Sequence, residues 1–117
     1  MMNARKFIHS FGYALQGIGT AMNEQNMRFH IMSAVIVIIA GIWTGISTLE
    51  WIILVLVMSL VVGAELFNTA IERVVDLASP DIHPLAKDAK DIAAGAVLVF
   101  ASASVIIGIL IFLPKWF

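Results

Sequence analysis

Four polar side chains occur at helical spacing at the end of an otherwise apolar run. Glu65, Asn68, Glu72 and Asp76 follow the segment "WIILVLVMSLVVGA", which contains no charged residue. At about 100° per residue, the four positions fall within an arc of about 80° on a helix, with neighbours one turn apart. Carboxylates and an amide in such a row can accept a proton, orient a hydroxyl group and bind a hard cation. The segment therefore predicts a polar stripe suited to proton transfer and metal binding.

The depth of Glu65 leaves two interpretations of this stripe. With a rise of about 1.5 Å per residue, Glu65 lies about 21 Å from Trp51, so about 9 Å of a hydrocarbon layer of roughly 30 Å remains beyond it. A carboxylate there is costly unless it is paired, protonated or facing a polar cavity. A protonated Glu65 could make a helix-packing hydrogen bond. Alternatively, Glu65 is a general base that receives the hydroxyl group of a lipid alcohol, with Asn68 orienting the reactants and Glu72 binding Mg²⁺ at the boundary.

The segment "NEQNMRFH" (23–30) brings further polar side chains to the same rim of the membrane: Glu24, Asn26, Arg28 and His30. Glu24 could be a second carboxylate for the metal. The structural alternative is a solvated helix start in which Glu24 pairs with Arg28 at i, i+4.

The segment "SPDIHPLAKDAKD" (79–91) places basic residues at the start of a predicted helix that Pro84 opens. Positive side chains in a first turn oppose the helix dipole, so Lys87 and Lys90 are unfavourable there for stability. They suit an anionic phosphate, which helix N-termini attract. The alternative is an anchor that holds this loop on the cytoplasmic side.

The composition defines the elements that must position these groups. The chain has 117 residues, of which 61% are hydrophobic and only 13% charged, against about one quarter charged in a soluble domain. Apolar stretches at 29–47, 51–75 and 88–113 are long enough to span a bilayer. Residues 4–23 carry apolar side chains at steps of three and four, as in an amphipathic helix on the membrane surface. We therefore expect a single all-α membrane domain over 1–117.

The distribution of basic and aromatic residues predicts the orientation. Basic residues precede the first span and surround the connection between the second and third, which places the N-terminus and the 76–88 loop in the cytoplasm of a multi-pass protein of the cell membrane. Trp43, Trp51 and Trp116 then lie at the outer interface, where indole rings are favoured. A net charge of −1 argues against nucleic acid as a partner, and the absence of cysteine excludes a thiol nucleophile.

Two motifs together resemble those of the prokaryotic diacylglycerol kinase family. They are "AELFNTAIERVVD" and, after the loop, "HPLAKDAKDIAAGAV", and the resemblance extends over nearly the whole chain. Within the family, "STLEW", "HPLAKDAKD" and "IGILIFLP" are most similar to the Gram-positive branch, whose members phosphorylate undecaprenol. The resemblance implies a homotrimeric bundle with sites shared between subunits, which transfers phosphate from ATP to a lipid alcohol with Mg²⁺.

The resemblance also implies roles for individual residues. Glu65 is the catalytic base and contacts the lipid substrate, and Asn68 belongs to the same catalytic stripe. Glu24 and Glu72 hold the metal and thereby the nucleotide. The remaining ATP-binding residues that it implies are Lys6 (or its neighbour Arg5), Tyr13, Asp81, Ile82, His83, Lys90 and Asp91.

The sequence thus predicts a lipid kinase that makes undecaprenyl phosphate, and three alternatives remain. The same chemistry on diacylglycerol would make phosphatidic acid. This alternative remains because no single residue of the sequence indicates the length of the lipid. Intramembrane carboxylates also occur in ion or proton transporters, although this chain has neither a repeat nor a broken helix. A membrane scaffold without catalytic activity is the third alternative.

Overall fold

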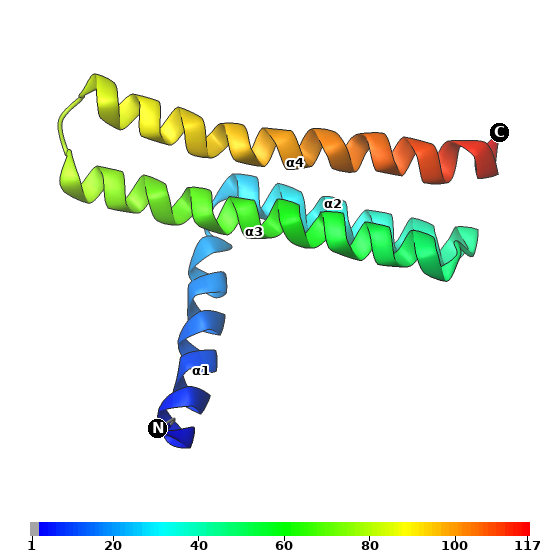
Figure 1. The fold of residues 1–117 in the computed structure, drawn as a ribbon, viewed down its shortest axis with the longest axis horizontal. Helices are drawn as coiled ribbons and strands as arrows, with labels where there is room; N and C mark the ends of the chain where they lie inside the picture. Colours follow the sequence, from blue (N-terminus) through cyan, green and yellow to red (C-terminus); the bar gives the residue numbers. More distant parts are fainter. Residues whose placement is uncertain (1–2) are drawn as a thin grey trace.

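The computed structural model describes residues 3–117 as four helices joined by short connections (Figure 1). They are α1 (Ala4–Ala21), α2 (Gln25–Thr44), α3 (Thr48–Ala78) and α4 (Pro84–Trp116). Helices α2, α3 and α4 lie side by side, and α1 leaves the bundle at a steep angle from the start of α2. The last three helices are long and apolar enough to cross a membrane. The predicted all-α membrane fold, with an N-terminal helix and three spanning helices, is confirmed.

The helix ends differ from the predicted ranges. Helix α1 stops at Ala21, whereas α3 and α4 are longer at both ends than the predicted 51–75 and 88–113. Helix α2 begins at Gln25, before the predicted residue 29, and ends at Thr44 instead of residue 47. The predictions followed the apolar residues, but backbone hydrogen bonding continues through polar residues until a cap ends it.

Local capping explains the tight turn between α2 and α3. Gly45 has a φ of 74°, the left-handed conformation that ends many helices and that glycine adopts without strain. Ser47 then caps α3: its side chain accepts a hydrogen bond from the Glu50 amide, and the Glu50 side chain accepts one from the Ser47 amide. This reciprocal pair satisfies two amide groups that the first turn leaves free.

A connection of five residues follows the opposite end of α3. After Ala78 the chain runs through residues 79–83 to α4, which begins with Pro84 as predicted. His83 caps this helix, because its Nδ1 accepts a hydrogen bond from the Leu85 amide at 3.1 Å. Pro84 and the His83 cap therefore fix where α4 begins.

A hydrophobic core cluster lies at the end of the bundle with the α2–α3 turn. Its buried core consists of Ile46, Leu54, Ile111 and Phe112. The predicted gathering of the three tryptophans at one end is observed. The Trp43 and Trp116 rings meet edge to face with centroids 6.4 Å apart, and Trp51 packs on Gly41.

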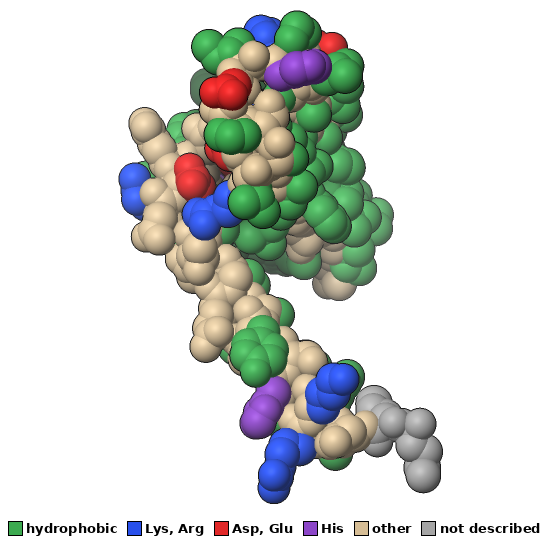
Figure 2. Space-filling model, turned by 90° about the vertical axis from the view of Figure 1, so that its left-hand side faces the viewer, with side chains coloured by type: hydrophobic (Ala, Val, Ile, Leu, Met, Phe, Trp, Pro, Cys, Tyr) green, Lys and Arg blue, Asp and Glu red, His purple; other side chains and the backbone are tan. Residues whose placement is uncertain are grey.

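The outer faces of the helices are apolar, as in a protein surrounded by lipid. Of the most hydropathic stretch of each spanning helix, only 11% in α2, 22% in α3 and 17% in α4 is buried within the chain. Figure 2 shows hydrophobic side chains over much of the visible side of the bundle, with charged side chains gathered near the α3–α4 connection and at the far end of α1. Phe7, Phe11, Leu15 and Ile18 are exposed on α1, which suits a helix lying in the membrane surface.

Candidate active site

Two polar side chains of the predicted stripe are buried inside the bundle. Glu65 is 3% exposed and Asn68 is 4% exposed, although both lie in the apolar helix α3. The stripe becomes more exposed toward the end of the helix. Glu72 is only partly buried, and Asp76 is exposed and forms an ion pair with Lys90 of α4. The polar stripe thus runs from a buried carboxylate to charged groups near the end of α3.

The nearest ionisable neighbour of Glu65 comes from α2. His30 Nε2 lies 3.7 Å from Glu65 Oε2, and the side chains are 15% and 4% exposed. The sequence predicts His30 at the membrane rim and gives it no role, because a pairing between two helices has no signal in local spacing. The available hint was its place six residues after Glu24 in the same polar segment, 23–30.

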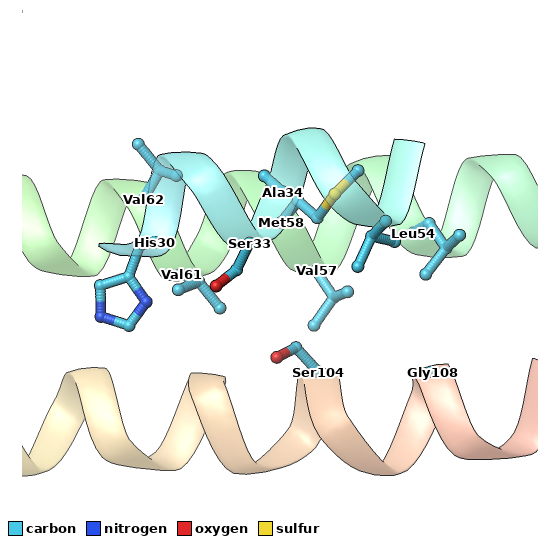
Figure 3. A pocket seen from close by; sticks show the side chains of 11 residues that line it. His30, Ser33, Ala34, Leu54, Val57, Met58, Val61, Val62, Ser104 and Gly108 are labelled. Atoms are coloured by element: carbon cyan, nitrogen blue, oxygen red, sulfur yellow. The ribbon is translucent and has the colours of Figure 1, made fainter. Parts of the chain in front are cut away.

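An apolar cavity of about 80 Å³ lies between α2, α3 and α4 on the side of His30 that leads into the bundle. Figure 3 shows the His30 ring and the Ser33, Val61 and Ser104 side chains directed into the space between the helices. Glu65 lies one turn beyond Val61 on α3. The buried carboxylate is therefore close to an apolar space within the bundle.

Asn68 lies about one helical turn from both Glu65 and Glu72 on α3. Its Nδ2 donates a hydrogen bond to Glu72 Oε1 at 3.1 Å, and its buried Oδ1 has no partner. A buried acceptor without a partner is unfavourable and marks a position where a ligand group or water can donate. Asn68 is thus oriented by Glu72 and keeps one acceptor free.

Glu24 makes a different ion pair from the one considered in the sequence analysis. Glu24 Oε1 lies 3.6 Å from Arg73 of α3, whereas Arg28 donates to the carbonyl groups of Met22 and Asn23. The structural alternative, in which Glu24 pairs with Arg28, is therefore wrong. Glu24 lies at the N-cap of α2, and the α2–α3 packing brings it to Arg73.

The carboxylates offer oxygen ligands at the rim without forming a complete cage. Among residues 3–117, no three His, Cys, Asp or Glu side chains come together as a metal site. The groups whose charges act on Glu65 nevertheless include Glu72 and Glu24 as well as His30. Hard oxygen donors of this kind suit Mg²⁺, which usually takes one or two carboxylates and completes its shell with water and phosphate.

The connection between α3 and α4 forms a hollow of about 320 Å³. Five of the predicted nucleotide-binding residues line it: Asp81, Ile82, His83, Lys90 and Asp91. Lys87 Nζ lies 2.6 Å from Asp91, and Lys90 Nζ lies 2.5 Å from Asp76. These pairs are largely exposed, so they contribute little to stability and can exchange for an anion.

Lys6 and Tyr13 lie apart from this hollow. Both are exposed on α1, whose N-terminal part points away from the bundle (Figure 1). Within one chain, only the last turns of α1 meet α3, along a groove that includes Ile18, Thr69 and Arg73. The predicted role of Lys6 and Tyr13 in nucleotide binding stays a prediction.

The fold and this arrangement define a small integral-membrane protein with a buried carboxylate below a charged surface. The family described as prokaryotic diacylglycerol kinase matches residues 12–112. The chain is 51% identical to the undecaprenol kinase of Bacillus subtilis, over 94% of this chain and 90% of that protein. It is 42% identical to a diacylglycerol kinase of Synechocystis, over 95% and 65%, and 29% identical to that of Escherichia coli, over 86% and 84%. The chain therefore belongs to the prokaryotic diacylglycerol kinase family and is a lipid kinase.

Proposed function

We propose that this protein transfers the γ-phosphate of ATP to undecaprenol and so forms undecaprenyl phosphate at the membrane–cytoplasm interface. The observation that carries the proposal is the burial of Glu65 next to an apolar cavity, at the end of a polar stripe that leads to the charged rim. The 51% identical relative named undecaprenol kinase supports the choice of lipid.

The reaction needs a base that a lipid hydroxyl can reach from the hydrocarbon. The Glu65 carboxylate accepts the proton of the hydroxyl group as the hydroxyl oxygen forms a bond to the γ-phosphorus. The bond between this phosphorus and the bridging oxygen breaks, and ADP leaves with the electron pair. The second hydrogen of Asn68 Nδ2, which is not used in the bond to Glu72, can donate to the hydroxyl oxygen and orient it.

Glu72 and Glu24 are the proposed ligands of Mg²⁺. When bound with ATP, this cation neutralises the charge that develops on the transferred phosphate. The hydrogen bond from Asn68 Nδ2 holds Glu72 in position, and the Arg73 ion pair does the same for Glu24. Both carboxylates keep oxygen atoms that can face a cation.

The proposed nucleotide site is the hollow at residues 79–91. Lys90 and Asp91 contact the ATP phosphates, the latter through the metal or a water molecule, and the 81–83 segment covers the nucleotide. Glu24 and Glu72 belong to this site through the metal, and Lys6 and Tyr13 approach the nucleotide from α1.

We also propose a homotrimer in which neighbouring subunits share each site. The exposure of Lys6 and Tyr13 on a helix that leaves its own bundle supports such sharing, as do the apolar outer faces of α3 and α4. The mass of the protein in detergent, from sedimentation with the detergent contribution subtracted, tests this proposal. A monomer with full activity would contradict it.

The proposed orientation has the N-terminus and the 76–88 loop in the cytoplasm of a multi-pass protein of the cell membrane. The gathering of Trp43, Trp51 and Trp116 at the opposite end supports it. Because the chain has no cysteine, single substitutions Ser79→Cys and Ser47→Cys can be labelled separately. In intact cells, an impermeant maleimide should label only Ser47→Cys; labelling of Ser79→Cys alone would reverse the orientation.

The decisive experiment gives the purified protein Mg²⁺ and ATP with either undecaprenol or diacylglycerol in bilayers of the same composition. We expect faster turnover of undecaprenol, and Glu65→Gln should lower lipid phosphorylation about 10²- to 10⁴-fold. ATP should still protect this variant against thermal unfolding. Glu50→Gln, at the other end of α3, is the matched control and should retain activity.

Two outcomes would contradict parts of the proposal. Faster turnover of diacylglycerol, the lipid in the names of the Synechocystis and Escherichia coli relatives, would replace the substrate but keep the chemistry. Full activity of Glu65→Gln would show that Glu65 is not the base and would contradict the proposed mechanism.

A further inference from the structure

We propose that His30 is a positioning residue for Glu65, which orients the carboxylate and takes over its proton after each transfer. The inference rests on the proposed function, because it assumes that Glu65 is the base. It starts from a contact between two helices, with His30 Nε2 3.7 Å from Glu65 Oε2.

The cationic side chains nearby have other partners, and the amide nitrogen of Asn68 donates elsewhere. Asn68 Nδ2 donates to Glu72, Arg73 pairs with Glu24, and Lys90 pairs with Asp76. Arg28 donates to backbone carbonyl groups at the end of α1. Within the part of the chain that the structure describes, His30 is therefore the ionisable side chain within ion-pair distance of Glu65.

The hydroxyl groups in the adjacent cavity do not compete for His30. Ser33 Oγ donates to the Phe29 carbonyl at 2.8 Å, and Ser104 Oγ donates to the Ala101 carbonyl at 2.7 Å. The remaining lining of this cavity is apolar. One side of the imidazole ring thus meets an apolar space, and its Nε2 faces the carboxylate (Figure 3).

This arrangement solves a problem that the proposed reaction creates. Glu65 holds the hydroxyl proton after phosphate transfer and must lose it before the next lipid arrives. An amide such as Asn68 cannot take up this proton, but imidazole exchanges protons near neutral pH. The proton moves from Glu65 Oε2 to Nε2 of a neutral ring that carries its own proton on Nδ1. The ring, which is 15% exposed, then gives one proton to water and returns to the same tautomer by exchange with water before the next turnover. Catalytic contacts are often long without substrate, so 3.7 Å is compatible with such a transfer.

Other titratable groups face the same place and would share a pH effect. They are Glu24 at the start of α2 and Glu72 on α3, whereas the α4 residues on this cavity, Ser104 and Gly108, do not titrate near neutral pH. A pH profile alone therefore does not identify His30. A chemical rescue experiment does.

The test measures steady-state lipid phosphorylation by the full-length protein in bilayers for the wild type, His30→Gln and His30→Ala. We expect kcat to fall about 100-fold in both variants, as for a displaced catalytic group, with KM for lipid and ATP nearly unchanged. Imidazole added to the buffer should restore kcat of His30→Ala at least several-fold and leave Glu65→Gln inactive. His9→Gln, an exposed histidine on α1, is the control and should behave as the wild type.

The outcomes separate this inference from the proposed function. A normal kcat for His30→Gln, or a loss in His30→Ala that imidazole does not restore although ATP still protects the protein from heat, overturns the role of His30. If His30→Ala does not fold, His30→Gln decides by its kcat and by its unchanged KM for lipid and ATP. If the wild type phosphorylates neither lipid, the proposed function itself fails.

Discussion

The two ends of the helical bundle contain similar residue types and use them differently. At the α2–α3 turn, Glu50 is occupied by the capping box and by Lys115 of α4, and Trp116 donates from its indole nitrogen to Thr44 at 3.0 Å. At the α3–α4 connection, Lys90 and Lys87 have exposed carboxylate partners around a hollow.

The two ends differ in whether the charged side chains are needed to hold the helices together. At the α2–α3 end, an adjacent apolar core and the edge-to-face contact of the Trp43 and Trp116 rings hold the helices together, and the ion pair adds to this packing. At the α3–α4 end, no comparable core is present among residues 3–117, and a buried acceptor on Asn68 lacks a partner. Charged side chains that are not needed to hold the helices together are available to bind a ligand.

The largest effect on activity should follow from removing a carboxylate at the α3–α4 end. We expect Glu72→Gln to lower lipid phosphorylation about 100-fold, because it removes the charge of a proposed ligand of Mg²⁺, while the amide oxygen can still accept the hydrogen bond from Asn68 Nδ2. The stabilisation by ATP against heat should also lose its dependence on Mg²⁺. Glu50→Gln, the corresponding change at the other end, should keep both properties. Equal losses in the two variants would show that the ends do not differ in this way.

A smaller effect is expected from Lys90. Lys90→Ala should raise KM for ATP about tenfold, because a charged hydrogen bond to phosphate is lost, and should change kcat less than KM. Lys115→Ala at the other end is the control, with no change expected in KM for ATP. A KM for Lys90→Ala equal to that of the wild type would leave the Asp76 pair as a structural contact only.

No change in substrate affinity is expected from a packing defect at the α2–α3 end. A Cβ at Gly41 would lie 2.7 Å and 2.9 Å from two ring atoms of Trp51, so Gly41→Ala should destabilise the fold by about 1–3 kcal/mol. Gly95→Ala is the control, since a Cβ there meets nothing within 4 Å. Thermal unfolding in detergent and KM for ATP should separate the two properties. A raised KM in Gly41→Ala would show that this end also controls the site.

Much of the fold could be predicted from the sequence because its signals are local. The absence of charge over three long runs, the Pro84 helix start and the spacing of the polar stripe are properties of neighbouring residues. The predicted helix ends were less accurate, since capping by Gly45 and Ser47 decides them rather than hydropathy.

The candidate site could be predicted only in part. Asp81, Ile82, His83, Lys90 and Asp91 lie in one short segment, so their common hollow follows from the chain itself. The structural alternative for Glu24 was wrong, because the i, i+4 rule favours Arg28 and ignores Arg73 on another helix. His30 was left without a role for the same reason.

The sequence by itself determined that this chain would cross a membrane three times and carry a carboxylate below the membrane surface, because transfer energies and helical periodicity depend on consecutive residues. Only the tertiary structure decided which side chains meet that carboxylate and which cations remain at the rim. Those contacts depend on how α2 and α4 are rotated against α3, and this rotation results from packing across the whole bundle.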